Sequence, residues 1–361
     1  FPIFSLDASA LMIVTYVGAF SALLAAIIAC TQTDIKRVLA YSTMSQIGYM
    51  MFALGISKNG GENGLGYMAS MFHLFTHAFF KSLLFLGAGA VIHMVHSNEM
   101  KDMGGLRKLM PITHIAFLIA CLAIAGIPPF AGFFSKEEIL AAAFEENKFI
   151  YGLALFTAAL TSFYMFRLYF NIFWSKEAAS KAHSDDHHNA HQHSEGSWTM
   201  KLPLVILAAC AITVGFIPFS NYITSDGAAL ETHINILFSI APVGLSLLAI
   251  LLSASFYKTQ NTKSDKVVAT LNGLYKIAYQ KFYIDELYLW ITKKIIFPFI
   301  GQPIAWADKN IVDGFMLLLA KTTSKISTAI KGVQSGKVQN YALYFLGGVL
   351  ALSVLFIYIW K

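Results

Sequence analysis

The stretch CLAIAGIPPFAGFFSKEEIL, residues 121–140, decides how this chain folds. It lies inside an apolar region, 111–146, that is long enough for two short membrane crossings or for one crossing with a break. Four residues that weaken or interrupt a helix lie in its middle: Gly126, Pro128, Pro129 and Gly132. The number of crossings made here fixes the side of the membrane on which every later segment lies.

The rest of the chain has the composition of a membrane protein. Of its 361 residues, 57% are hydrophobic and only 13% are charged, whereas about 25% of the residues of a soluble domain are charged. Apolar runs that approach or exceed the ~20 residues of a membrane span recur at 10–30, 37–56, 66–96, 149–174, 201–219, 235–257 and 340–360. The sequence therefore predicts an all-α polytopic membrane protein. Its net charge of +6 resides in lysines and arginines that flank the spans, so topology explains this charge and no nucleic-acid partner is expected.

The basic residues between the spans decide how often region 111–146 crosses. With one crossing, eleven Lys and Arg residues fall in the loops of one side and two fall on the other. With two crossings the later loops change sides, and the division becomes six against seven. Because Lys and Arg concentrate on the cytoplasmic side, we expect a single discontinuous helix over 111–146 and about eight transmembrane helices in all.

A charged amphipathic segment precedes the last span. Residues 283–337 are rich in aliphatic side chains, but lysines and aspartates occur throughout, so this segment is not expected to cross. Its apolar residues recur at helical spacing opposite lysines, a pattern typical of a helix lying along a membrane interface. About 45 helical residues would reach roughly 70 Å, and we expect Pro298 and Pro303 to break or bend the early part.

The sequence holds candidate metal ligands but no redox motif. Five histidines cluster within 176–199, a tract that fits either a metal-binding loop or a solvated segment of low complexity. Cys30, Cys121 and Cys210 each lie alone in an apolar run, so neither a disulfide framework nor a zinc site is indicated. No nucleotide-binding or iron–sulfur motif is present. Any electrons that drive this protein are therefore expected on other chains.

The span over 66–96 carries three groups that can hold a proton: His73, His77 and Lys81. Their spacing of four residues places them on one helix face, and titratable groups within a span usually face the bundle interior. Histidine both takes up and releases protons near neutral pH. We interpret the row as a proton relay. The alternatives are hydrogen-bonded packing and, from the HxxxH spacing, a metal site, although no further ligand on this helix completes one.

A second candidate pair, Lys136 and Glu137, follows the helix break directly. Backbone groups left unpaired at a break inside a membrane need protein or a water-filled cavity around them. The pair could take part in the relay or form an ordinary charge pair at a loop. Polar residues over 42–46 could line a hydrated route, and Arg167 could extend its charge to the membrane surface.

Four motifs carry a family resemblance: TDIKRVLAYSTMSQIGYM (33–50), HLFTHAFFKSLLFL (73–86), MGGLRK (103–108) and AGFFSKEEIL (131–140). They resemble the antiporter-like membrane subunits of respiratory complex I and the related Mrp-type cation/proton antiporters. The ending GVQSGKVQNYALYFLGG (332–348), after a lateral helix, favours the complex I members. The resemblance implies that His73, His77 and Lys81 lie on a central hydrophilic axis. It places Lys136, with Glu137 beside it, on the route out of the membrane.

The resemblance also implies an organisation in five parts. These are a second antiporter-like five-helix repeat with its broken helix (1–174), a His-rich cytoplasmic loop (175–200), two further spans (201–258), a linker with the lateral helix (259–338) and a terminal anchor (339–361). Because the chain begins at Phe1 and not at methionine, we expect a fragment whose first repeat lies upstream.

The implied function is proton translocation as part of an NADH–quinone oxidoreductase. No cofactor is expected on this chain, since NADH, FMN, iron–sulfur clusters and quinone would be handled by partner subunits. Other membrane subunits, including an adjacent antiporter-like one, and the lipid bilayer are the expected partners. A bacterial membrane is favoured over the mitochondrial inner membrane. The alternatives are an Mrp-type Na⁺/H⁺ antiporter subunit and, less favoured, a subunit of an energy-converting hydrogenase or a bicarbonate-handling relative.

Overall fold

A computed structural model describes residues 7–57, 64–174, 195–224, 229–230, 235–259, 262–332 and 334–360. Within these ranges the regular structure is helical, apart from one isolated bridge between Asp34 and Glu99. The chain forms two units, Phe1–Phe282 and Tyr283–Lys361, here called the bundle and the C-terminal unit. Each unit is described by itself.

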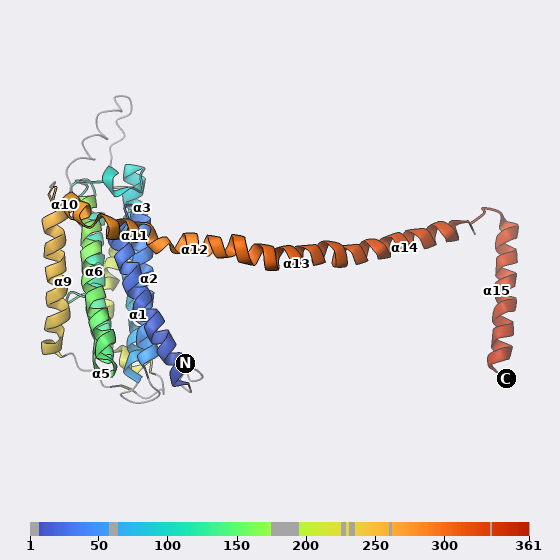
Figure 1. The fold of residues 1–361 in the computed structure, drawn as a ribbon, viewed down its shortest axis with the longest axis horizontal. Coiled ribbons are helices and arrows are strands. Elements are labelled where there is room, and N and C mark those ends of the chain that lie inside the picture. The colour runs from blue at the N-terminus through green and yellow to red at the C-terminus, as the bar shows by residue number, and fades with distance from the viewer. Residues whose placement is uncertain are drawn as a thin grey trace, which may run out of the picture. The chain divides into compact units, whose positions relative to one another are not determined.

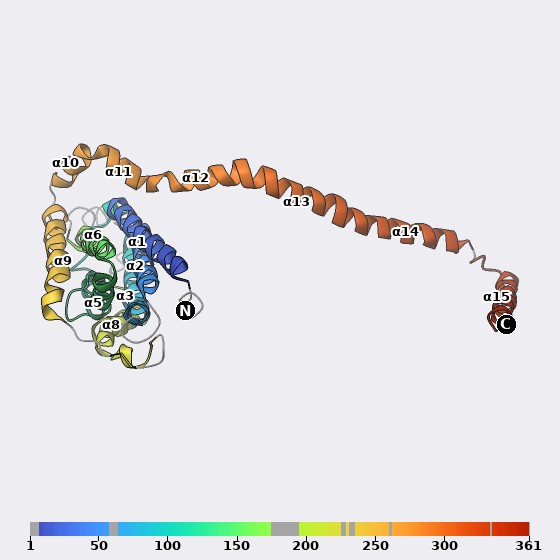
Figure 2. The same ribbon diagram turned by 60° about the horizontal axis from the view of Figure 1, so that its bottom comes forward.

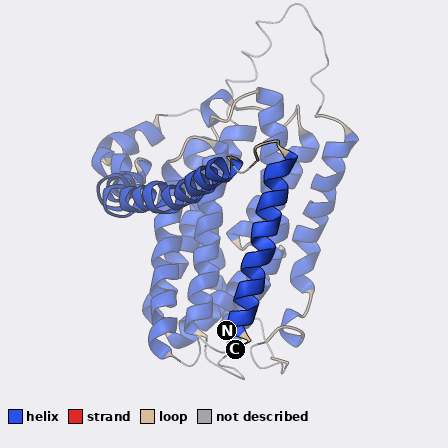
Figure 3. Cartoon of the chain, turned by 90° about the vertical axis from the view of Figure 1, so that its right-hand side faces the viewer, coloured by secondary structure: helices blue, strands red, loops and turns tan. Residues whose placement is uncertain are grey.

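The bundle is built from long helices that run roughly side by side (Figures 1 and 2). Its main members are α1 (Ala8–Thr31), α2 (Ile35–Ile56), α3 (Leu65–Val95), α4 (Pro111–Ala125), α5 (Ala131–Glu146), α6 (Lys148–Phe173), α8 (Trp198–Thr213) and α9 (Ile236–Tyr257). Figure 3 shows that the described residues contain no strand. The predicted all-α class is confirmed.

Glycines bring α1 and α2 into close contact. A Cβ atom on Gly18 would lie 2.6 Å from the backbone nitrogen of Phe52, and one on Gly48 would lie 2.7 Å from that of Ala22. Such small residues let membrane helices approach closely where no hydrophobic effect drives them together. The packing holds the polar stretch of α2 in place, and Ser42, Ser45 and Gln46 are fully buried.

Helices α4 and α5 follow one another along α3 and form one interrupted span. Near the start of α4, Thr113 and Phe117 lie against Gly87 of α3. At the break, Gly132 lies 3.5 Å from the ring of Phe80, measured from a Cβ atom placed on the glycine. Further along α5, Ser135 reaches His73. The contacts thus move steadily down α3 while the chain advances through both short helices. This arrangement confirms the predicted discontinuous helix over 111–146.

A hydrogen bond between two loops agrees with the prediction that this region crosses once. The backbone nitrogen of Leu106, before α4, donates to the carbonyl of Ile172 at the end of α6, at 3.4 Å. Two crossings would place these residues on opposite sides. The loop between α3 and α4 also pairs with the loop between α1 and α2, because the nitrogen of Ile35 donates to Asn98 and that of Met100 donates to Thr33. The basic loops therefore gather at one end of the bundle.

Two apolar clusters form the core. One surrounds Phe80, Phe117 and Tyr164, and the other surrounds Phe52 and Ile139. Because each cluster includes residues from α3, one of the two short helices and α6, the broken span is held on both sides of its break. The polar residues of α3 lie within this packed interior.

Six of the described helices are long and apolar enough to span a membrane: α1, α3, α6, α8 with the short η4 (Val214–Phe216), α9 and α15 (Val338–Ile359). The broken pair α4–α5 and the more polar α2 account for the difference from the predicted eight. Both lie in the bundle, but their crossing remains a prediction. After α9, the short helices α10 (Lys263–Thr270) and α11 (Asn272–Tyr279) return to the end of α1, where Tyr275 Oη donates to the Thr31 carbonyl at 3.5 Å.

The C-terminal unit consists of one long helix and the predicted anchor α15. Helical structure is continuous through α12 (Ile284–Ile291), η7 (Thr292–Gly301), α13 (Gln302–Ala307), η8 (Asp308–Val312) and α14 (Asp313–Lys331). The prolines were expected to break or bend this segment, and the break is not found. Around Pro298 the backbone is π-helical, and in this wider turn the missing proline N–H does not end the helix. Pro303 is the second residue of α13 and directly follows this π-helical stretch.

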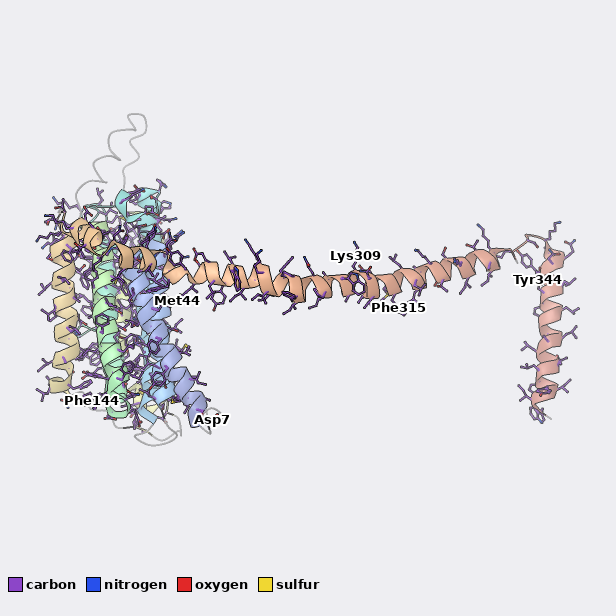
Figure 4. All side chains as sticks on the ribbon, viewed as in Figure 1. Asp7, Met44, Phe144, Lys309, Phe315 and Tyr344 are labelled. Carbon is purple, nitrogen blue, oxygen red and sulfur yellow. The ribbon has the colours of Figure 1, made fainter. Side chains whose placement is uncertain are left out.

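Other described residues of the C-terminal unit do not cover the apolar side chains of this long helix. None of the described residues of α12 to α15 is buried. In Figure 4 its side chains, Lys309 and Phe315 among them, stand out from the ribbon into open space, and Phe315 is 56% exposed. The histidines of the loop expected over 175–200 all lie between 183 and 193, outside the described residues, whereas 198–200 belong to α8. Among the described residues, no group of three or more His, Cys, Asp or Glu side chains could hold a metal.

Candidate functional site

Helix α3 holds the three predicted groups inside the bundle. His73 is fully buried, and His77 and Lys81 are 8% and 5% exposed. The centroids of the two imidazole rings lie 6.1 Å apart. The predicted shared face is therefore present and points toward other helices, as titratable residues inside a span generally do. Their role as a relay stays a prediction.

His73 has a hydrogen-bond partner at each ring nitrogen. Its Nε2 lies 3.1 Å from Oε1 of Gln46 on α2, and its Nδ1 lies 2.9 Å from Oγ of Ser135 on α5. Ser135 in turn lies 2.8 Å from Oγ1 of Thr76, one turn along α3. All four side chains are fully buried. The imidazole therefore joins α2 to the helix that carries Lys136.

Lys81 is anchored to the second helix through the backbone. Its Nζ donates to the carbonyl of Leu39 at 3.0 Å, and the same carbonyl accepts from Oγ1 of Thr43 at 3.0 Å. Nζ also lies 5.9 Å from the centroid of the Phe85 ring. Among the described residues no carboxylate forms an ion pair with Lys81. A buried ammonium is costly unless neighbours or water compensate its charge, so this is a position where a proton can be released.

The helix break forms the second part of the site. Helix α4 ends at Gly126, whose φ of 72° is left-handed and whose nitrogen donates to the carbonyls of Leu122 and Ala123. The last carbonyls of any helix lack partners within it. Here Nζ of Lys136 donates to the Ile124 carbonyl at 2.7 Å. The positive charge lies at the negative end of the α4 dipole, a favourable placement for a cation.

Glu137 faces the other way, toward α9. Its Oε1 accepts a hydrogen bond from Oγ of Ser239, whereas its Oε2 is buried and has no partner among the described residues. A cavity of about 20 Å³ lies beside it, enough for about one water molecule. Its lining includes Gly126, Lys136, Glu137 and Ser246. The predicted pair is thus brought to one small cavity at the break, but the structure shows no ion pair between its members.

Arg167 binds the end of a neighbouring helix. It is only 8% exposed, and its Nη1 donates to the carbonyl of Gln32 at 2.8 Å. Gln32 is the residue that ends α1, where free carbonyls need a donor. Arg167 therefore satisfies the end of α1, as Lys136 does at α4, and an extension of its charge to the membrane surface stays a prediction.

Two participants were missed by sequence reasoning. Ser135 directly precedes Lys136 in the sequence. Its position beside a charged residue inside an apolar region is a signal that could have singled it out. Ser239 lies in the very apolar helix α9, where one serine gives no signal without its partner Glu137. Gln46 was recognised only as part of a polar stretch. The assembled site is a row of groups that bind protons, running from Lys81 through the histidines to the break, with hydroxyl and amide groups between them.

Comparisons with known proteins place this geometry in context. Residues 1–162 match a family described as "NADH:quinone oxidoreductase/Mrp antiporter, TM". NAD(P)H-quinone oxidoreductase chain 5 of the cyanobacterium Picosynechococcus sp. is 36% identical over 99% of this chain and 57% of its own length. The chloroplastic subunit 5 of Mesostigma viride is 37% identical over 98% of this chain and 55% of its own length. This chain thus spans little more than half of these relatives.

Solved structures share the fold. A chain of the Mrp complex from Dietzia sp. has a TM-score of 0.54 at 18% identity, covering 96% of this chain and 34% of that one. A chain of the membrane-bound sulfane sulfur reductase, an archaeal respiratory membrane complex, has a TM-score of 0.54 at 24% identity and covers 96% of this chain and 56% of that one. The resemblance to antiporter-like membrane subunits, first found in the four sequence motifs, is confirmed.

Proposed function

We propose that the chain is part of a proton-translocating membrane subunit of an NAD(P)H–quinone oxidoreductase, starting from the match of residues 1–162 to the NADH:quinone oxidoreductase/Mrp antiporter transmembrane family. The observation that carries the proposal is the buried row of titratable groups. His73 on α3 contacts Ser135 on the helix that carries Lys136 and Glu137 at the break, and His77 and Lys81 lie buried further along α3.

The proposed path follows this row. Lys81 holds a proton deep in the bundle, and the two histidines carry it along α3 toward α5. Lys136 and Glu137, beside the small cavity, receive it where water can enter. Each step needs only a group that can hold and release a proton within hydrogen-bond reach of the next, directly or through water. The buried groups on the two neighbouring helices α3 and α5 support such a path.

Redox chemistry belongs to partner chains in this proposal. The sequence has no motif for NADH, FMN, iron–sulfur clusters or quinone. The curated relatives are named as subunits of an oxidoreductase, so we assign these groups to other subunits of the same complex. The uncovered apolar residues of α12 to α15 favour contacts with other membrane subunits and lipid. A bacterial cell membrane is the proposed location, supported by the cyanobacterial relative.

The alternative is a secondary antiporter subunit that exchanges Na⁺ for H⁺, which the shared fold of the Mrp chain keeps open. Purification of the full-length subunit from its native membrane separates the two. We expect flavin and iron–sulfur subunits to copurify, and NAD(P)H oxidation by quinone to drive proton movement in resealed vesicles. Na⁺-dependent proton exchange without copurifying redox subunits would instead establish the antiporter.

A further inference from the structure

His73 differs from the other titratable groups of the row because both of its ring nitrogens are held by neutral side chains from other helices. Gln46 and Ser135 lie 3.1 Å and 2.9 Å from Nε2 and Nδ1. By contrast, Nε2 of His77 is buried with no partner among the described residues. The surroundings of His73 thus determine where its proton can reside.

Both neighbours can act as donor or acceptor. A glutamine amide offers an oxygen on one side and an NH₂ group on the other, and a serine hydroxyl donates one bond and accepts others. Either orientation of the glutamine amide and either tautomer of the imidazole agrees with these heavy-atom positions. The heavy-atom distances around His73 therefore admit more than one hydrogen arrangement.

In the first arrangement all bonds run toward α2. Thr76 donates to Ser135, Ser135 donates to the bare Nδ1 of His73, and Nε2–H donates to Oε1 of Gln46. Nothing in this arrangement requires an atom other than hydrogen to move from the observed positions. The imidazole is then the neutral tautomer with its hydrogen on Nε2.

In the second arrangement the bonds run toward α5. Rotation of the Gln46 amide lets its NH₂ group donate to Nε2, and Nδ1–H then donates to Ser135. The Ser135 hydroxyl then donates to Oγ1 of Thr76, which lies 3.2 Å from the carbonyl oxygen of His73 and can donate there. In the charged form, both N–H groups donate, to Gln46 Oε1 and Ser135 Oγ. Every protonation state of His73 is therefore satisfied.

We propose that Gln46 and Ser135 are positioning residues that keep both neutral tautomers of His73 accessible. A proton arriving on one ring nitrogen can then leave from the other, toward the helix that carries Lys136. The transport consequence rests on the proposed function, whereas the tautomer balance is a property of the chain itself. Removing one partner leaves the nitrogen on that side unpaired, and the hydrogen settles on the nitrogen that still has a partner.

The test is solid-state NMR of the full-length subunit in its complex, with ¹⁵N-labelled histidine. The His73 signals are assigned by their absence from a His73→Phe variant. We expect the native protein to show both neutral tautomers of His73. Gln46→Leu should leave only the Nδ1–H form, which donates to Ser135. Ser135→Ala should leave only the Nε2–H form, which donates to Gln46.

Ser70→Ala is the matched control for Ser135→Ala. Ser70 is fully buried on α3, and its hydroxyl donates to the Met50 carbonyl at 2.9 Å. The control should keep both tautomers. Proton translocation should fall by about tenfold in Gln46→Leu and Ser135→Ala and stay near the native rate in Ser70→Ala.

Two results would overturn the inference: a single His73 tautomer in the native protein, or the same tautomer balance in Gln46→Leu and Ser135→Ala as in the native protein. The native spectrum and the Ser135→Ala spectrum decide the matter even where Gln46→Leu does not assemble. A native complex that moves no protons but shows the expected tautomers would contradict the proposed function and leave the positioning role standing.

Discussion

Lys81 and Lys136 are buried lysines whose surroundings suggest substitutions that can test their roles. Each donates to a single backbone carbonyl, Leu39 for the first and Ile124 for the second. Among the described residues neither forms an ion pair with a carboxylate. A lysine held in this way is either a fixed structural cation or a group that cycles its proton, and substitution separates these roles.

Lys81→Arg distinguishes a proton carrier from a fixed charge. Arginine keeps the positive charge and donor groups but does not release its proton at working pH. If Lys81 cycles its proton, we expect Lys81→Arg and Lys81→Met both to lower proton translocation by about tenfold or more. The measurement is proton uptake by vesicles that hold the assembled complex.

Lys148→Met serves as the control for these lysine variants, because Lys148 is exposed at the start of α6 and packs over the Phe144 ring. It should transport at the native rate. Full transport by an assembled Lys81→Arg complex would show that this lysine is a structural cation, and the relay would then need another carrier.

Lys136→Met should cost stability as well as transport. The substitution removes the donor to the Ile124 carbonyl and the cation at the end of α4, effects worth about 1 kcal/mol or more together. Lys81→Met also leaves one carbonyl short of a donor, but Leu39 keeps its bond from Thr43. We therefore expect a larger drop in melting temperature for Lys136→Met than for Lys81→Met. Equal melting temperatures would count against the helix-end role of Lys136.

At this scale the sequence predicted the charged residues of the site better than the neutral ones. A histidine or lysine in an apolar span is unusual, so His73, Lys81 and Lys136 could be found from composition alone. Ser135 and Ser239 could not, because a serine is common in membrane helices and its importance depends on a partner far away in sequence. The acceptor of Arg167 could not be predicted for the same reason, because Gln32 lies at the end of another helix.

At the scale of the helices, the close contact between α4 and α5 depends on Gly132, where a side chain would have almost no space. A Cβ atom on Gly132 would lie 1.9 Å from the carbonyl oxygen of Ala123. Gly132→Ala should therefore push the end of α4 away from α5, a steric cost of about 1–3 kcal/mol. We expect a lower melting temperature and weaker proton translocation, since the contact between Lys136 and Ile124 is carried by the same two helices.

Gly89→Ala is the matched control for Gly132→Ala. Gly89 lies in α3, and a Cβ atom there would have no atom within 4 Å. This variant should keep the native melting temperature or exceed it slightly, because alanine favours helices over glycine. Equal melting temperatures of Gly132→Ala and Gly89→Ala would contradict the close contact between α4 and α5.

The long helix of the C-terminal unit is expected to act in assembly and not in chemistry. Leu318→Pro removes a backbone donor and clashes with the preceding turn, at a cost of about 3 kcal/mol. We expect this change in α14 to reduce the yield of the assembled complex. Lys321→Gln, in the same helix, should leave yield and transport unchanged, because isolated surface charges contribute little. A normal yield of the assembled complex in the Leu318→Pro variant would show that the long helix is not needed for assembly.

The elements were predictable where charge or apolarity decided them. Counting basic residues gave one crossing for 111–146, and the bond between Leu106 and Ile172 agrees with it. The continuity of the helix at Pro298 was not predictable from proline chemistry alone, because a proline usually ends an α-helix but can be accommodated in a π-helical turn. A π-helical turn of this kind cannot be recognised from the pattern of apolar and polar residues.

For the whole molecule, the single crossing fixes which loops share a side of the membrane. Lys101 and Lys266 are exposed near the end of the bundle where the basic loops gather, and Lys148 is exposed between α5 and α6. With one crossing through α4 and α5, Lys148 lies on the side opposite to the other two. Because basic loops concentrate in the cytoplasm, Lys101 and Lys266 are expected there.

Single cysteines at these three positions, labelled with a membrane-impermeant maleimide in vesicles of known orientation, test this topology. We expect Lys101→Cys and Lys266→Cys to react from the cytoplasmic side and Lys148→Cys only from the opposite side. The unsubstituted protein measures any labelling of Cys30, Cys121 and Cys210, of which Cys121 is buried. Labelling of Lys148→Cys and Lys101→Cys from the same side would mean that 111–146 crosses twice. The row from Lys81 to Glu137 would then begin and end on one side of the membrane, and it could not carry protons across.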